Sequence, residues 1–134
     1  SEMCIRDRGI IYMDGDDVTR EFILLPEFEK QWNIMGLGDD ELKALQEELT
    51  INPLKGDVMQ GTGGLRKIRI SLDNRGKSGG ARICYVDFAV YDKIYLITAY
   101  PKSVKDNLSK EHRNAIKSKI KELELILFNR RSKS

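Results

Sequence analysis

Residues 65–72 alternate apolar and polar side chains, and this alternation constrains the fold more than any other feature of the chain. Ile68 and Ile70 fall on one side of an extended strand, whereas Lys67 and Arg69 fall on the other. A period of two excludes a helix and predicts a strand with one buried and one exposed face. The chain is therefore expected to contain a sheet with positive charge on its outer surface.

Two more strand patterns follow. After a glycine-rich loop at residues 73–80, residues 81–88 place Arg82 on one face of a strand and Ile83 on the other. Residues 94–100 give a third strand after a tight turn. If the first two strands pair, Arg82 joins the basic face of the preceding strand, and three cations converge on a small area.

Helix signals flank these strands. Capping residues, proline at a first helical position and apolar side chains at spacings of three and four mark the helices. The remaining elements are a strand at 20–25, a helix from Pro26, a second helix capped by Asp39 or Asp40 and ended by Asn52-Pro53, and a final helix capped by Ser109 with an apolar stripe of Ile116, Ile120, Leu123 and Leu127. The order β-α-α-β-β-β-α predicts an α+β fold, with a small antiparallel sheet, two N-terminal helices and a C-terminal helix.

The length of 134 residues and a hydrophobic content of 40% fit one domain. We expect residues 19–128 to form it, with a disordered or non-native tail at 1–18 and a basic tail at 129–134. Residues 1–8 resemble translated sequencing-adapter DNA, so Met13 is a candidate start. Since no apolar run approaches the ~20 residues of a membrane span, we expect a cytoplasmic protein without membrane contact.

Charge is segregated along the chain. Residues 61–86 contain six Lys or Arg and one acid, residues 14–60 carry a net charge of −8, and residues 87–134 carry +5. The total of +2 hides this division. Clustered cations repel one another, and an external polyanion relieves that repulsion, which indicates a nucleic acid or an acidic protein as partner.

Two glycine-rich motifs resemble nucleotide-binding sequences but lack required residues. Residues 76–78 end like a P-loop, yet Ser71 stands where that motif requires glycine, and a strand follows instead of a helix. Residues 61–64 fail the dinucleotide fingerprint because Arg66 occupies its last glycine position. We therefore expect no nucleotide cofactor.

The chain has one histidine, His112, and two distant cysteines, Cys4 and Cys84. These residues do not have the spacing of a zinc site, so we expect no metal. His112 falls on a surface helix and is interpreted as solvated. Cys84 lies inside a strand pattern and is interpreted as a reduced, structural thiol.

Residues 56–69 and 75–82, together with Tyr100-Pro101-Lys102, resemble the HigB branch of the RelE/ParE toxin superfamily, and the resemblance covers roughly residues 20–125. It implies a compact RelE-like fold and the toxin half of a type II toxin–antitoxin operon. Such toxins are metal-independent endoribonucleases that cut mRNA on the ribosome. The implied partners are mRNA, the ribosome and a HigA-like antitoxin with a helix-turn-helix domain, through which alone the toxin would reach operator DNA.

The resemblance also implies a set of site residues. Its two basic strand positions fall on Lys67 and Arg69, and the arginine of the next strand falls on Arg82. Lys102 and Tyr100 correspond to the positions at the end of the last strand. Some RelE members use a tyrosine in the C-terminal segment, but residues 106–109 of this chain contain none.

These residue types suit RNA cleavage without a metal, because the 2′-OH of RNA is a built-in nucleophile. We expect Arg69 and Arg82 to bind the phosphate, since a guanidinium contacts two phosphate oxygens at once. Lys67 and Lys102 would divide proton transfer. Three further cations are predicted to bind the RNA backbone: Arg66, Arg75 and Lys77.

Two other functions fit the same residues. One is a toxin similar to the ParE branch, which shares the fold and inhibits DNA gyrase without cutting RNA. The other is a basic nucleic-acid-binding module that has no toxicity. The shared face of Lys67, Arg69 and Arg82 favours the nuclease over the ParE-like toxin, and induced expression with a growth measurement tests the non-toxic module.

Overall fold

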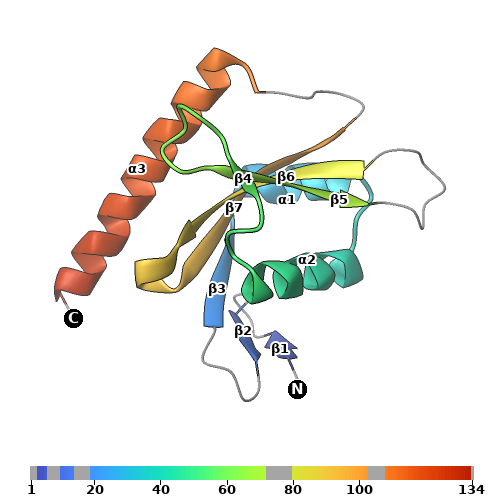
Figure 1. Cartoon of the computed structure of the whole chain (residues 1–134), viewed down its shortest axis with the longest axis horizontal. Helices are drawn as coiled ribbons and strands as arrows, with labels where there is room; N and C mark the ends of the chain where they lie inside the picture. Colours follow the sequence, from blue (N-terminus) through green and yellow to red (C-terminus); the bar gives the residue numbers. More distant parts are fainter. Residues whose placement is uncertain (1–2, 6–9, 14–18, 72–79, 103–107, 134) are drawn as a thin grey trace.

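The computed structural model describes residues 3–5, 10–13, 19–71, 80–102 and 108–133 (Figure 1). Its elements in chain order are β1 (Met3–Ile5), β2 (Ile10–Met13), β3 (Thr19–Leu24), α1 (Pro26–Ile34), α2 (Asp39–Ile51), β4 (Asp57–Val58), β5 (Arg66–Ser71), β6 (Gly80–Phe88), the 3₁₀ turn η2 (Ala89–Tyr91), β7 (Lys93–Pro101) and α3 (Lys110–Lys133). None of these helices combines the length and the apolar character that crossing a membrane requires.

The strands form one mixed sheet in the order β1-β2-β3-β7-β6-β5-β4. All neighbouring pairs are antiparallel except β3 and β7, which run parallel with Phe22 opposite Ile94. The predicted α+β fold and the order β-α-α-β-β-β-α are confirmed from β3 onward, with the two-residue β4 as an addition. The expectation of a small antiparallel sheet is corrected at the β3–β7 pair, which is parallel because the chain crosses over through α1 and α2 before it returns to the sheet.

The two ends of the chain differ from expectation. Met3–Ile5 and Ile10–Met13 pair with each other, and Ile10–Met13 pairs with β3, so part of the expected N-terminal tail extends the sheet. Ile and Tyr have high strand propensity, and β3 would otherwise present an unpaired edge. At the other end α3 runs to Lys133 through most of the expected basic tail, because Arg and Lys favour helices and neither Gly nor Pro interrupts them.

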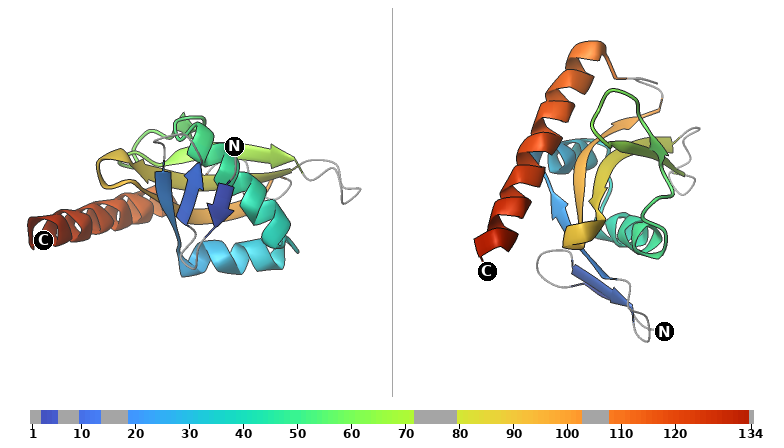
Figure 2. Two further views of the ribbon diagram at one scale, coloured as in Figure 1. Left: turned by 90° about the horizontal axis from the view of Figure 1, so that it is seen from below. Right: turned by 60° about the vertical axis from the view of Figure 1, so that its left-hand side comes forward.

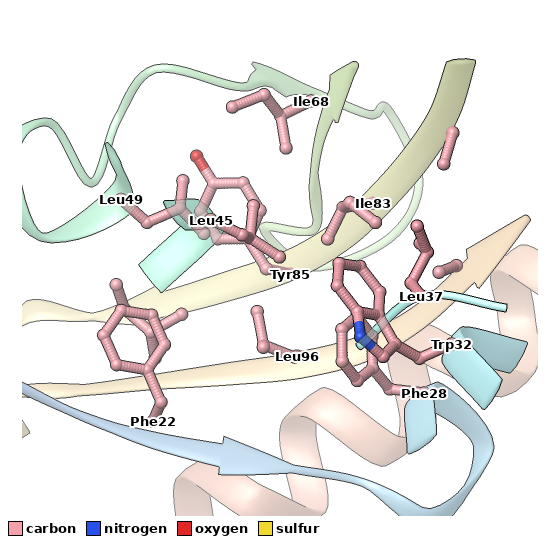
Figure 3. Packing of buried hydrophobic residues seen from close by; sticks show 13 residues of the cluster. Phe22, Phe28, Trp32, Leu37, Leu45, Leu49, Ile68, Ile83, Tyr85 and Leu96 are labelled. Carbon is pink, nitrogen blue, oxygen red and sulfur yellow. The ribbon is translucent and has the colours of Figure 1, made fainter. Parts of the chain in front are cut away.

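One face of the sheet packs against α1 and α2 (Figure 3). Phe28 and Trp32 lie one helical turn apart on α1 and stack with their ring centroids 5.3 Å apart. Leu45 and Leu49 of α2 are buried on the same side of the sheet. The sheet contributes to this core the side chains of Phe22, Ile68, Ala81, Ile83, Tyr85, Ile94, Leu96 and Ala99.

The opposite face packs against α3, which runs along one side of the molecule (Figure 2). The predicted apolar stripe of α3 is confirmed, because all four of its residues are buried. They contact sheet residues that alternate with those of the first core: Cys84, Val86, Phe88, Tyr95, Ile97 and Tyr100. The two faces of β6 and β7 are therefore both covered, which explains why these strands are apolar almost throughout.

The helix ends follow local rules. Ser109 caps α3 as predicted, with its hydroxyl accepting a hydrogen bond from the backbone N–H of His112 at 3.1 Å. In α2 the N-cap is Gly38, not Asp39 or Asp40. The Glu41 carboxylate accepts a hydrogen bond from the Gly38 N–H at 2.9 Å, which satisfies this donor without a capping side chain.

Tyr85 joins the sheet to the segment that follows α2. Its hydroxyl donates to the Pro53 carbonyl at 2.8 Å and accepts from the Gly56 N–H at 2.9 Å. We expect Tyr85→Phe to lower the free energy of unfolding by about 1–3 kcal/mol, because two backbone groups lose their partner. Urea denaturation measures this loss. Tyr91→Phe, at a half-buried ring on the η2 turn, should cost less than about 0.5 kcal/mol, and equal losses for both variants would contradict this role of Tyr85.

Candidate functional site

Arg69, Arg82 and Tyr100 form a row across three neighbouring strands. In the sheet register Arg69 of β5 lies opposite Arg82 of β6, and Arg82 lies opposite Tyr100 of β7. Opposed residues of antiparallel strands share a face, with their Cα atoms roughly 4.5–5.5 Å apart. The structure thus brings two predicted phosphate-binding arginines side by side, on the face that α3 covers elsewhere.

A second row lies beside the first, toward α3. Lys67 of β5 faces Cys84 of β6, which faces Thr98 of β7. Lys67 stands two residues from Arg69, or roughly 7 Å along the strand. The predicted alternation of β5 is confirmed, because Arg69 is exposed and Lys67 is half-buried while Ile68 is buried in the opposite core.

Cys84 is buried between Lys67 and Thr98 in the second row, and it is not a nucleophile. Burial raises the pKa of its thiol to about 12, and the positive charges of Lys67 and Arg82 counteract this only in part. A thiol with this pKa is protonated at neutral pH and unreactive. Both cations lie near this thiol, since Lys67 is opposite Cys84 in the register and Arg82 is two residues away on β6.

Tyr100 borders the site at its β7 end. The residue is only 8% exposed, and it packs in the cluster that includes Leu108 and the α3 stripe. Arg82 is half-buried beside it, whereas Arg69 is exposed. The row therefore runs from solvent at β5 toward the protein interior at β7, and a bound phosphate would be increasingly desolvated along it.

Lys102 is held near this row by a backbone contact. Its N–H donates to the Gly80 carbonyl at 2.9 Å, which ties the end of β7 to the start of β6. Gly80 also lies close to β5, since a Cβ added there would meet the Ile70 carbonyl oxygen at 2.1 Å. Any side chain at Gly80 would push β5 and β6 apart at the end of the sheet where Lys102 lies.

The predicted RNA-binding residues do not join the row within the described part of the chain. Arg66 falls on the opposite face of β5, and its guanidinium donates to the Gly56 carbonyl at 2.7 Å and the Leu54 carbonyl at 3.3 Å. It holds the segment before β4. The period of two along β5 already predicted that Arg66 and Lys67 point to opposite faces of the strand. Arg75 and Lys77 lie outside the described residues.

Acidic residues of α2 line a cavity on the other side of β5, and sequence reasoning did not find them. A cavity of about 530 Å³ separates α2 from β5. Its lining includes Arg69 and three carboxylates of α2, those of Asp40, Glu41 and Glu48. These carboxylates lie more than 20 residues from Arg69 in the chain, so only the fold reveals that they face the same cavity.

The described residues contain no group of three or more His, Cys, Asp or Glu side chains placed to hold a metal ion. His112 is half-buried and lines a cavity of about 280 Å³ between α3, β7 and the start of α1. Thr98 of the second row also lines this cavity, whereas Lys67, Arg69, Arg82 and Tyr100 do not.

Comparison with known proteins gives a family match. A family model described as the RelE toxin of the RelE / RelB toxin–antitoxin system matches residues 24–129, a range that holds both rows and Lys102. Among solved structures, the chain is similar to a double arginine-to-alanine mutant of the E. coli toxin RelE in the free state. That similarity has 18% sequence identity and a TM-score of 0.46, and it covers 63% of this chain and 85% of that chain.

Proposed function

The chain belongs to the RelE toxin family of toxin–antitoxin systems, and we propose that it is a HigB-type endoribonuclease that cleaves mRNA on the ribosome and so inhibits translation. The observation that carries this proposal is the register that sets Arg69 opposite Arg82 beside Lys67. Family membership implies an antitoxin partner, for which we propose a HigA-like protein with a helix-turn-helix domain. The site of action would be the cytoplasm, where translating ribosomes are found.

In the proposed reaction the 2′-OH attacks the adjacent phosphate and the 5′-oxygen leaves. The enzyme must align these groups, move two protons and stabilise the extra negative charge of the transition state. Arg69 and Arg82 suit this last task, because adjacent guanidinium groups can each bind two phosphate oxygens and remain charged. Arg82 contributes more, because it lies further from solvent, where an ionic contact is stronger.

Proton transfer requires groups on both sides of the phosphate. Lys67 lies on the Cys84 side of the arginine row, and Lys102 follows β7 on the Gly80 side. A nucleophile and a leaving group in line also lie on opposite sides of the phosphorus. This arrangement supports the division of proton transfer between Lys67 and Lys102, with Tyr100 positioning Arg82 as its cross-strand neighbour.

A cleavage assay on translating ribosomes tests the function. We expect primer extension to detect cuts in mRNA on ribosomes, few cuts in free mRNA, and no change in DNA supercoiling by gyrase. Gyrase inhibition without mRNA cleavage would instead support a ParE-like toxin. If neither activity appears and induced expression does not slow growth, the chain is a non-toxic binding module.

A further inference from the structure

A positively charged cavity lies outside the two rows. It measures about 470 Å³ and separates the loop after β4 from the first turns of α3. Its lining consists of Gln60, Gly61, Leu108, Lys110, Arg113 and Asn114. The lining thus holds two cations and two amides but no carboxylate, in contrast to the cavity beside α2.

The loop side of this cavity has a fixed shape. The buried Thr62 hydroxyl donates to the Met59 carbonyl at 2.5 Å and accepts from the Leu65 N–H at 3.1 Å. Gly61 adopts a φ of +75°, and a Cβ added there would meet nothing within 4 Å. The backbone at Gly61 therefore offers open space to a ligand, and a side chain would both fill that space and strain the turn.

The helix side presents cations in a stripe. Lys110, Arg113 and Lys117 are spaced by three and four residues, so they lie on one side of α3 over about 10 Å of its length. Arg113 donates to the Gln60 carbonyl at 3.3 Å, and the Lys117 side chain lies beside Gly63. Both contacts show that this side of α3 faces the loop.

The cavity borders the candidate active site through Leu108. Leu108 lines the cavity and belongs to the buried cluster that contains Tyr100 and Cys84. The stripe on α3 and the arginine row therefore lie next to the same apolar cluster. A chain with regularly spaced negative charges could contact both, and RNA is such a chain.

We propose that this cavity binds a backbone phosphate of the mRNA strand, away from the phosphate that is cut, with Lys110 and Arg113 as its ligands. The proposal rests on the proposed function. Because it concerns binding, it is measurable even if no cleavage is found. It assigns to the loop after β4 the role of shaping a subsite for the RNA backbone.

The test measures binding of a fluorescent single-stranded oligoribonucleotide that 2′-O-methyl groups make uncleavable. We expect the double variant Lys110→Ala/Arg113→Gln to bind about 10-fold or more weakly than the wild-type chain at low salt. The slope of log affinity against log salt should become shallower by roughly 0.7, since one lost phosphate contact on a single strand contributes roughly 0.7. Lys110→Ala alone removes an exposed side chain and should reduce the slope by roughly half as much.

Lys119→Ala is the matched control. Lys119 lies on the same helix, pairs with Glu122 at 3.6 Å and lines the cavity beside His112 instead. The Lys119→Ala variant should bind the oligonucleotide within about two-fold of the wild-type affinity. An unchanged salt slope in both Lys110 variants would overturn the proposal. So would variants that bind the oligonucleotide normally and lose affinity only for vacant ribosomes. Absence of cleavage by the wild-type chain, together with oligonucleotide binding that depends on Lys110 and Arg113, would count against the proposed function alone.

Discussion

Arg82→Ala is expected to reduce the single-turnover rate of mRNA cleavage on the ribosome by roughly 100- to 1,000-fold, the usual cost of removing one group that stabilises transition-state charge. Arg82 is the middle member of its row, with Arg69 on one side and Tyr100 on the other. Its half-buried position excludes part of the solvent that would screen its charge. The exposed Arg69 should contribute less, so Arg69→Ala should cost roughly 10-fold.

Two variants separate the charge of Arg82 from its shape. Arg82→Lys keeps the positive charge but loses the bidentate contact, so its rate should fall between those of the wild type and Arg82→Ala. Lys119→Ala removes a cation of α3 that lines the cavity beside His112 and should cleave like the wild type. Induced expression of Arg82→Ala should no longer arrest growth. Wild-type cleavage by Arg82→Ala would remove Arg82 from the active site.

The local pattern of the sequence predicts much of this site. The period of two in β5 separates Lys67 and Arg69 from Ile68, and the same period in β6 separates Arg82 from Ile83. Patterns of this kind define faces because successive side chains of a strand point to opposite sides. They do not define register, and a shift by one residue would have moved Arg82 away from Arg69.

The remaining features depend on contacts between distant parts of the chain. The parallel pairing of β3 with β7 places Glu21 opposite Lys93, 72 positions away, where the two side chains form an ion pair at 2.6 Å. The carboxylates of α2 also come close to Arg69 only through the fold, where they line the same cavity. No periodic pattern encodes such contacts, since periodicity reports only whether a residue faces the core.

Helix α3 illustrates how one element can serve both packing and binding. Its buried stripe closes the second core, and its charged side faces the loop after β4. From the sequence, the apolar spacing predicts the first role. The second depends on which side of α3 meets the loop, and the fold settles this by placing Gln60 against Arg113.

The largest stability effect is expected at a buried ion pair remote from the candidate active site. Arg20 of β3 and Asp87 of β6 lie 2.8 Å apart, from Nε to Oδ1, and their side chains are 13% and 4% exposed. Asp87→Asn should lower the free energy of unfolding by about 3 kcal/mol, because Arg20 would keep its charge in a buried position and lose its closest carboxylate. Urea denaturation, followed by circular dichroism, measures the loss.

Asp92→Asn provides a matched comparison, since Asp92 pairs with the same arginine. Its carboxylate lies 3.7 Å from Arg20 and is 69% exposed, so its removal should cost less than about 0.5 kcal/mol. Asn also tolerates the φ of 56° at this position, which keeps backbone strain out of the comparison. Similar losses for the two variants would show that burial does not determine the strength of the Arg20 pairs.

The position of Asp87 makes this prediction informative about function as well. Asp87 lies five residues from Arg82 on β6, or roughly 17 Å along the strand. Below its lowered melting temperature, folded Asp87→Asn should therefore cleave mRNA at the wild-type rate, whereas Arg82→Ala should be stable and inactive. A cleavage defect in folded Asp87→Asn would mean that the ion pair controls the register of β6, and with it the alignment of Arg69 and Arg82.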